Sequence, residues 1–259
     1  MTSLVSVDLP PVGGLPGLTQ GAYGTRGNLE LVVPAVDTGF WVLWFNADEH
    51  DERSGAAVGC WSGGLHVETD DRLTAVTISQ IEAGPRFLEV TLLGGDTARR
   101  MFWCPERGFV AGGVLEPAAA AVAPIRELAG AMTTMITTTD GRTLWLRGEG
   151  YPEPAWAATP APPAAWEEFR RMPDGWTVRV QDGRVRFEGE RGIVETGIEA
   201  DAAAAARTTL DGGRTDLLVR RGDRLAHAWT GRTDDAWPQP RTITSTVWTE
   251  PEDRVHRRG

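Results

Sequence analysis

The sequence predicts an all-β protein, a five-bladed β-propeller of degenerate repeats about 42 residues long. An aromatic residue recurs at a constant interval of 42 residues, at Trp103, Trp145, Phe187 and Trp229. A turn sequence and, before it, an apolar or β-branched run precede these aromatics, which is the pattern of strand–turn–strand units. Repeats of this length, with room for four short strands, are typical of propeller blades. We therefore expect one propeller domain over residues 1–259.

The first unit shows the pattern most clearly. A strand is expected at Leu29–Val33, a turn at Asp37–Gly39 and a second strand at Phe40–Phe45. Trp44, in that second strand, precedes the next aromatic of the series by 59 residues, which is one period plus 17. The polar stretch Ala47–Gly64 accounts for the excess, and we expect it to form a loop.

The later units repeat this order more weakly, with approximate unit boundaries at 26–75, 76–125, 126–170, 171–210 and 211–250. Their apolar runs are Phe87–Leu93, Met132–Thr137, Trp176–Val180 and Asp216–Val219. Propellers usually close by pairing strands from the two ends of the chain. We therefore expect a leftover N-terminal strand, Leu4–Val7 or Leu18–Ala22, to complete the last unit beside Arg241–Trp248.

Segments rich in alanine and proline are expected to connect strands: Pro117–Pro124, Pro152–Ala165 and Ala200–Ala206. Ala164–Met172 fits a short amphipathic helix, because Trp166, Phe169 and Met172 would share one face. The alternative fold is an irregular β-sandwich in which the regular spacing is accidental.

Composition excludes several functions. The formal net charge is −10, so neither nucleic acid nor an anionic membrane, which need clustered cations, is expected as a partner. The chain has no lysine, which excludes lysine nucleophiles and Schiff bases. Neither the histidines nor the two cysteines, Cys60 and Cys104, have metal-ligand spacing, so we expect no metal and no cofactor. The N-terminal residues lack a signal-peptide pattern and no apolar run is of membrane-spanning length, which predicts a cytoplasmic protein.

One stretch resembles a known repeat. Thr19–Pro34 (TQGAYGTRGNLELVVP) is similar to the repeat of bacterial Trp-rich β-propeller lectins of the fucose-binding and tachylectin-like type. The matching residues are Gln20, Gly21, Gly24, Gly27, Asn28, Glu30 and Leu31 in the first half of the repeat, and Leu225, His227, Trp229, Trp237 and Pro240 in its second half. The second unit matches in part, and the third and fourth hardly match. The resemblance supports the propeller fold more than it supports sugar binding.

Tryptophan is the main candidate for ligand binding, since the chain has 11 tryptophans and only two tyrosines. Indole faces stack on the C–H surfaces of sugars, and the ring N–H can donate to a hydroxyl. The resemblance implies pockets lined by Trp44, Trp61, Trp145, Trp156, His227, Trp229 and Trp237. The leading function is thus a module that binds a carbohydrate or a hydrophobic small molecule. In the alternative, Trp44, Trp103 and Trp229 only pack between blades, and His227 is a structural histidine.

An enzyme is the competing interpretation. Glu30 and Glu89 each lie 14 residues before a tryptophan, and Asp216 has a comparable place in the last unit. If the two glutamates approached each other, one pKa would rise and the pair could hydrolyse glycosides. A cyclase or isomerase with a Trp-lined funnel for a hydrophobic metabolite is the other possible enzyme. Alternatively, each glutamate only hydrogen-bonds the backbone of its blade.

Overall fold

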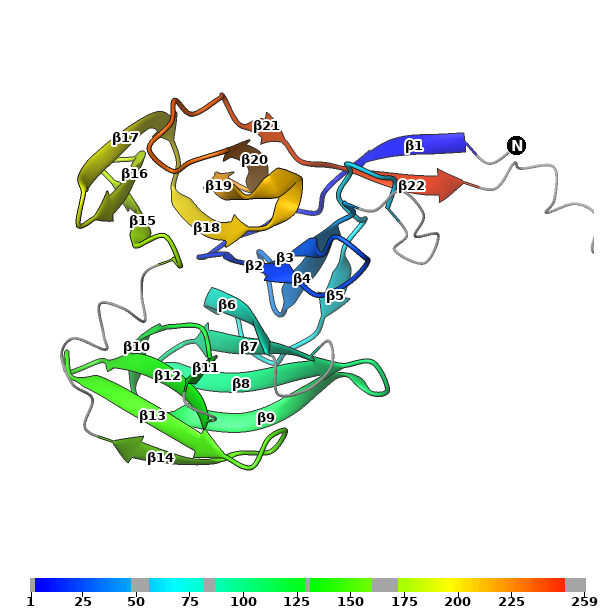
Figure 1. The fold of residues 1–259 in the computed structure, drawn as a ribbon. Coiled ribbons are helices and arrows are strands. Elements are labelled where there is room, and N and C mark those ends of the chain that lie inside the picture. The colour runs from blue at the N-terminus through cyan, green and yellow to red at the C-terminus, as the bar shows by residue number, and fades with distance from the viewer. Residues whose placement is uncertain (1–2, 48–55, 82–86, 129–130, 160–171, 250–259) are drawn as a thin grey trace, which may run out of the picture.

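The computed structural model describes residues 3–47, 56–81, 87–128, 131–159 and 172–249. Within them the protein is built from antiparallel β-strands, with a single 3-10 turn, η1 (Leu210–Gly212). No helix in these segments is long and apolar enough to cross a membrane. The all-β prediction is confirmed (Figure 1).

Five sheets follow one another along the chain, and in each the strands pair mainly with their neighbours in sequence. The first sheet has the order β2 (Gly17–Gly21), β3 (Asn28–Pro34), β4 (Phe40–Phe45) and β5 (Leu65–Val67). The second has the order β6 (Leu73–Ile81), β7 (Phe87–Gly94), β8 (Thr97–Cys104) and β9 (Gly108–Glu116). The third has the order β10 (Ala119–Val122), β12 (Ala131–Thr138), β13 (Thr143–Glu149) and β14 (Ala155–Thr159), with β11 (Arg126–Leu128) also paired to β12.

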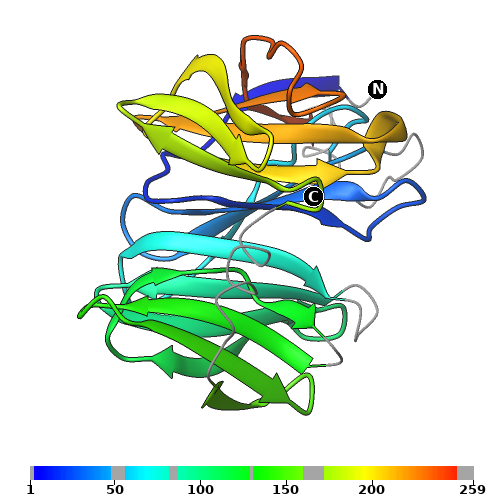
Figure 2. The same cartoon turned by 60° about the vertical axis from the view of Figure 1, so that its left-hand side comes forward.

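The fourth and fifth sheets lie on the opposite side of the first sheet from the second and third sheets. The fourth has the order β15 (Trp176–Gln181), β16 (Arg184–Gly189) and β17 (Gly192–Glu199). The fifth has the order β18 (Ala202–Thr208), β19 (Arg214–Arg221), β20 (Arg224–Thr230) and β21 (Arg241–Thr242). Figure 2 shows the first sheet between the fifth and the second. These are five separate sheets and not the two facing sheets of a β-sandwich.

The position of the first sheet explains its composition. Every residue of β3 is buried, because a sheet packs on each of its faces. Leu29 and Leu31 belong to a core that includes Leu218 of the fifth sheet, whereas Val32 belongs to a core that includes Val90 of the second. A continuous apolar run is the sequence pattern of a strand buried on both faces.

The first strands of all five sheets line one central cavity of about 950 Å³. Among these strands, β2 contacts both β6 and β18, β18 contacts β15, and β6 contacts β10 and β11. Gly17 allows the contact between β2 and β6, since a Cβ atom there would lie 2.7 Å from Cα of Thr77.

Substituting Gly17 with alanine should therefore lower the free energy of unfolding by about 1–3 kcal/mol, because β2 and β6 would have to move apart. Chemical denaturation would measure this. Gly59 is a position for comparison. A Cβ atom at Gly59 would have no other atom within 4 Å, so an alanine there would not crowd a neighbour, but the positive φ of 74° would strain it. Gly17 has no positive φ, and a Gly17→Ala protein as stable as the wild type would show that the strands are not in such close contact.

Closure of the last sheet differs from the prediction. The chain ends do pair, β1 (Ser3–Asp8) with β22 (Thr244–Thr249), but they form a separate two-stranded sheet that projects from the body (Figure 1). Residues 18–22, one candidate for the closing strand, instead fall largely in β2 of the first sheet. The last sheet obtains its first strand from β18, in an alanine-rich segment that we expected to be a connection. Each of the three predicted connections in fact contains a strand: β10, β14 and β18.

The physical reason is packing. In β18 buried and partly buried residues alternate strictly, because the strand lies between its own sheet and the first strands of other sheets. Alanine has low β-propensity, but tertiary packing overrides this preference. The predicted helix at 164–172 lies outside the described residues except for Met172.

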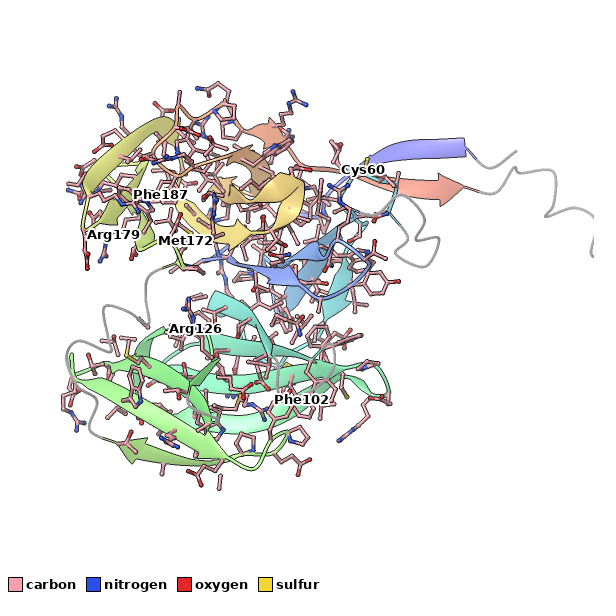
Figure 3. The ribbon with its side chains drawn as sticks, in the orientation of Figure 1. Cys60, Phe102, Arg126, Met172, Arg179 and Phe187 are labelled. Carbon is pink, nitrogen blue, oxygen red and sulfur yellow. The ribbon has the colours of Figure 1, made fainter. Side chains whose placement is uncertain are left out.

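The aromatic residues spaced 42 residues apart do not all lie on the same strand of their sheets. Trp44, Trp103, Trp145 and Trp229 lie on the third strands of their sheets, β4, β8, β13 and β20. Phe187 lies on β16, the second strand of the fourth sheet (Figure 3). Its place in the series is therefore not structurally equivalent to the others.

Candidate ligand-binding site

A cavity of about 280 Å³ lies between the first and second sheets. Two partly exposed tryptophans line it, Trp44 from β4 and Trp103 from β8. Each stands on the third strand of its sheet. The other lining residues are Tyr23, Asn28, Glu30, Val42, Leu65, Leu88 and Phe109.

Strand register brings the two tryptophans to the same cavity. In the first sheet Trp44 pairs with Glu30, so their side chains share the face turned toward the second sheet. In the second sheet Trp103 pairs with Leu88, and both point back toward the first sheet. Two indole rings from neighbouring sheets thus line one site, and the carboxyl group of Glu30 lines it with them.

Glu30 supplies the carboxyl group of this cavity. Its side chain is buried, and Nδ2 of Asn28 donates a hydrogen bond of 2.6 Å to Oε1 of Glu30. Burial raises the pKa of Glu30 to about 7, and the hydrogen bond from Asn28 opposes this rise. At neutral pH the carboxyl group can therefore either accept a hydrogen bond or donate one.

The loop before β3 holds Asn28 in position. Oδ1 of Asn28 accepts a hydrogen bond of 3.3 Å from the backbone N–H of Tyr23, which also lines the cavity. Gly21 is required opposite it, since a Cβ there would lie 2.2 Å from Oδ1 of Asn28. Gly21 and Asn28 of the repeat motif thus shape one wall of the site.

Glu89 has a different role. It is fully buried and accepts two hydrogen bonds from Arg100, 2.8 Å from Nε and 2.6 Å from Nη2. Nη2 of Arg100 also donates to the carbonyl of Pro152, in the turn between β13 and β14 of the third sheet, at 2.8 Å. Burial raises the pKa of Glu89, and the bonds from Arg100 oppose that rise.

The structure does not bring Glu30 and Glu89 together on one site. Glu89 pairs in the sheet with Phe102 and not with Trp103, because the turn between β7 and β8 has two residues, 95–96, whereas the turn between β3 and β4 has five, 35–39. Glu89 therefore faces the third sheet, whereas Glu30 faces the second. Each carboxyl group has its own partner, and no shared pair of the kind that hydrolyses glycosides is formed between them.

The last sheet and the first form an aromatic cluster, in which the His227 ring lies 5.4 Å from Trp61 and 5.2 Å from Trp229. Asp216 is fully buried and lies 2.9 Å from Nε2 of His227 and 2.9 Å from Nη2 of Arg214. Within the cluster His227 and Trp61 are buried, and Trp229 is 39% exposed. Three of the predicted ligand residues thus lie together between these two sheets.

The remaining predicted tryptophans are elsewhere. Trp237 stacks on Phe187 at 5.1 Å and donates its ring N–H to the carbonyl of Thr233. Trp156 packs in the core between the second and third sheets, and Trp145 lies partly exposed on β13. Trp44 is therefore the only predicted ligand tryptophan among the residues that line the 280 Å³ cavity. Sequence reasoning missed Tyr23 and placed Trp103 in the packing alternative.

No metal centre is found in the described parts of the chain, where no three His, Cys, Asp or Glu side chains are grouped to hold an ion.

Comparisons with known proteins identify no family. No family model matches the chain, and no curated protein does. A solved structure of the Aleuria aurantia lectin with α-methyl-L-fucoside is 14% identical with a TM-score of 0.36, covering 93% of this chain and 61% of the lectin. A lectin from Burkholderia pseudomallei is 16% identical with a TM-score of 0.41, covering 90% of this chain and 71% of that one. The PQQ-bound aldose sugar dehydrogenase of Streptomyces coelicolor is 12% identical with a TM-score of 0.36, covering 96% and 99%.

The chain thus spans about three fifths of the length of the Aleuria lectin. Because these similarities are weak, the function proposed below is based on the geometry of the chain itself.

Proposed function

We propose that the chain is a single-domain, five-bladed β-propeller that binds a carbohydrate or another small ring-shaped molecule between its first two blades. Support for the fold comes from five successive sheets whose first strands line one central cavity, as blades surround a propeller axis. Support for the function comes from the cavity that Trp44 and Trp103 enclose with Glu30.

The chemistry of this cavity suits a sugar ring. Aromatic faces attract the C–H surface of a pyranose, and the carboxyl group and the Asn28 amide can orient its hydroxyl groups. The volume of about 280 Å³ lies near the lower end of the range for ligand pockets, roughly 300–1,000 Å³. One sugar ring or a molecule of similar size is therefore the expected ligand.

Replacing Trp44 with alanine should weaken binding at least about tenfold, because an aromatic wall of the cavity is lost. The measurement is intrinsic tryptophan fluorescence during titration with methyl glycosides, including methyl α-L-fucoside, checked by calorimetry. Trp145→Ala is the matched control, since Trp145 has the same place on the third sheet but does not line the cavity. Saturable binding by the wild type and the control, but not by Trp44→Ala, supports the proposal. Equal loss in both variants, or no saturation by any glycoside in the wild type, contradicts it.

One observation favours a second candidate function, a single-site enzyme. A buried carboxyl group with a pKa of about 7 in a largely apolar cavity has the properties of a general acid or base. Such a site could move a proton on a hydrophobic metabolite, as an isomerase or cyclase does. Incubation with a cell extract tests this: a compound that disappears with the wild type and persists with Glu30→Gln indicates catalysis. Binding without consumption leaves the ligand-binding function alone.

A further inference from the structure

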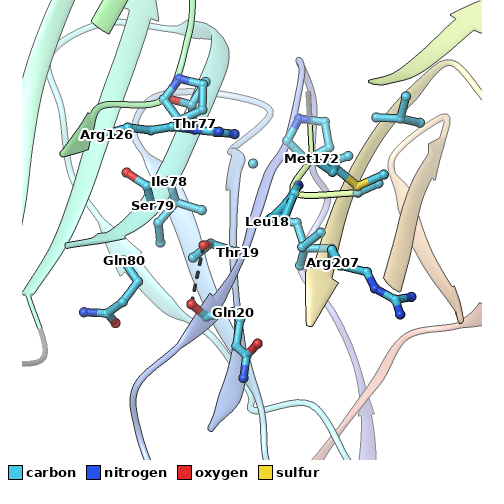
Figure 4. A pocket seen from close by; sticks show the side chains of 18 of the residues that line it. Leu18, Thr19, Gln20, Thr77, Ile78, Ser79, Gln80, Arg126, Met172 and Arg207 are labelled. Carbon is cyan, nitrogen blue, oxygen red and sulfur yellow. Dashed lines mark hydrogen bonds between the residues drawn. The ribbon is translucent and has the colours of Figure 1, made fainter. Parts of the chain in front are cut away.

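The two cavities of the molecule differ in their lining. The cavity between the first and second sheets has nine lining residues, and four of them are aromatic: Tyr23, Trp44, Trp103 and Phe109. Figure 4 shows the central cavity for comparison, and none of the described residues that line it is aromatic. The face of an aromatic ring carries partial negative charge and attracts cations. The aromatic lining of the smaller cavity therefore favours a ligand with positive charge.

Strand register places two of these rings side by side on the second sheet. Trp103 of β8 pairs with Phe109 of β9, so their side chains share the face that is turned toward the first sheet. Both residues are partly exposed and line the cavity, so a ligand can reach their rings. The carboxyl group of Glu30 lines the same cavity from the first sheet.

Glu30 differs from the other buried carboxyl groups in its partner. Three acidic side chains are buried in the described parts of the chain, Glu30, Glu89 and Asp216. Glu89 is paired with Arg100. Asp216 is paired with Arg214. Glu30 instead accepts a hydrogen bond from the neutral amide of Asn28, and no described arginine forms an ion pair with it. A buried carboxylate without a cation is unfavourable, so a cationic ligand beside Glu30 would be stabilised.

The fifth sheet shows how the chain itself supplies such a cation. Arg214 begins β19 two residues before Asp216, and its Nε donates a hydrogen bond of 3.1 Å to Oδ2 of Asp216. The guanidinium carbon lies 4.8 Å from the ring centre of Trp229, which pairs with Asp216 in the sheet. In the first sheet Asn28 has the place of Arg214, because it begins β3 two residues before Glu30. An uncharged amide thus stands where the fifth sheet has a guanidinium.

The chemistry of the lining indicates which kind of cation fits. A primary ammonium or a guanidinium needs several hydrogen-bond acceptors when it leaves water. The cavity is instead completed by the apolar side chains of Val42, Leu65 and Leu88. A quaternary ammonium group donates no hydrogen bonds, and aromatic side chains are its usual contacts in proteins. This lining therefore suits a methylated cation best.

We propose that the cavity between the first and second sheets binds a small molecule through a quaternary ammonium group, which contacts Trp103 and Phe109 and is neutralised by Glu30. This inference rests on the proposed function only in placing a ligand in this cavity. It adds a ligand class that the proposed function does not include, since a neutral sugar carries no charge for Glu30 to balance.

The test is calorimetry at about pH 8 with choline, with tetramethylammonium and with 3,3-dimethylbutan-1-ol. The last compound is the neutral analogue of choline, in which carbon replaces the nitrogen. The wild type should bind choline with a dissociation constant below about 1 mM. It should bind the neutral analogue at least about tenfold more weakly, because that compound has the shape of choline without its charge. No binding of choline or tetramethylammonium, or equal affinity for choline and the analogue, would overturn the proposal.

Two variants test the contacts. Glu30→Gln removes the negative charge, and Trp103→Leu removes an aromatic face but keeps an apolar side chain. In each variant the ratio of choline affinity to analogue affinity should fall about five- to tenfold. A change in the fold or shape of the cavity would affect both compounds and leave the ratio unchanged. An unchanged ratio in Trp103→Leu would mean that choline binds elsewhere and would overturn the proposal.

Glu195→Gln is the matched control for charge. Glu195 is exposed on β17 and lines neither cavity, and its substitution changes the net charge by the same amount as Glu30→Gln. The affinity ratio should therefore stay within about twofold of the wild-type value. An equal fall in the ratio for Glu195→Gln and Glu30→Gln would mean that choline responds only to net charge, which is incompatible with a site at Glu30.

A measurement on the wild type needs no substitution. Burial raises the pKa of Glu30 to about 7, so its carboxyl group is mostly neutral at pH 6 and mostly ionised at pH 8. Choline affinity should therefore rise up to about tenfold from pH 6 to pH 8, whereas the affinity for the neutral analogue should not. Tyr23 is the other ionisable residue of the lining, and a phenol keeps its proton in this range. Equal choline affinity at both pH values would contradict neutralisation by Glu30.

The glycoside titrations described above separate this inference from the proposed function. Binding of choline without binding of any glycoside supports the quaternary ammonium site and contradicts the sugar site. Binding of a glycoside without binding of choline or tetramethylammonium has the opposite meaning.

Discussion

Replacing Arg100 with methionine should lower the free energy of unfolding by about 3–5 kcal/mol. Arg100 is 1% exposed, and it is the ion-pair partner of the fully buried Glu89. Without Arg100 the carboxylate would be left uncompensated between the second and third sheets, where water cannot solvate it. The hydrogen bond to the Pro152 carbonyl would be lost as well. Denaturant unfolding followed by circular dichroism measures the change.

A second substitution at Glu89 separates charge from packing. Glu89→Leu combined with Arg100→Met removes both charges, and such replacements of buried pairs are often nearly neutral. We therefore expect the double variant to recover most of the stability lost in Arg100→Met. If the single variant loses less than about 1 kcal/mol, the pair is not buried as the structure shows.

Glu30 should make the stability of the protein depend on pH. Its pKa is about 7 in the folded chain and 4.5 for an unperturbed glutamate, so folding favours the protonated form. The stabilisation from this proton is fully present below about pH 4.5 and is lost as the pH rises to about 7. Each pKa unit corresponds to about 1.4 kcal/mol, so the loss across this range is about 3 kcal/mol.

Glu30→Gln isolates the effect, because glutamine is similar in shape and does not titrate. The difference in unfolding free energy between the wild type and this variant should change between pH 4.5 and 7 and be constant outside that range. Above pH 7 the variant should be relatively more stable by the amount that the wild type has lost. A difference that is independent of pH would show that Glu30 is ionised at an ordinary pKa.

The fold could be predicted where the sequence pattern is strong. The apolar run of β3 and the aromatic strand β4 coincide closely with the predicted strands. The first strands of the sheets were harder to predict, since β2 is rich in glycine and β18 in alanine. Their strand conformation depends on contacts with other sheets, and local preference does not reveal such contacts.

The site could be predicted only in part, for reasons of register. Trp44 and Glu30 were predicted as functional residues and do line one cavity. The equal spacing of Glu30 and Glu89 from their tryptophans suggested equivalence. Glu30 does pair with Trp44, but Glu89 pairs with Phe102, so Trp103 lies on the opposite face of its sheet from Glu89. Trp61, His227 and Trp229 were expected in pockets. They lie together between the first and fifth sheets, where Trp61 and His227 are buried and Trp229 is 39% exposed.

The pairing of β1 with β22 has a consequence for the order of folding. In the described part of the chain every other strand ladder joins strands that are adjacent in sequence or separated by one strand. Each of the five sheets can thus begin to form soon after its own residues leave the ribosome. The ladder from Ser3↔Thr249 to Asp8↔Thr244 closes a loop of nearly the whole chain, and loop closure of this kind is slow. During synthesis β1 has no partner strand until all five sheets have been made. Its interstrand hydrogen bonds are therefore the last to form.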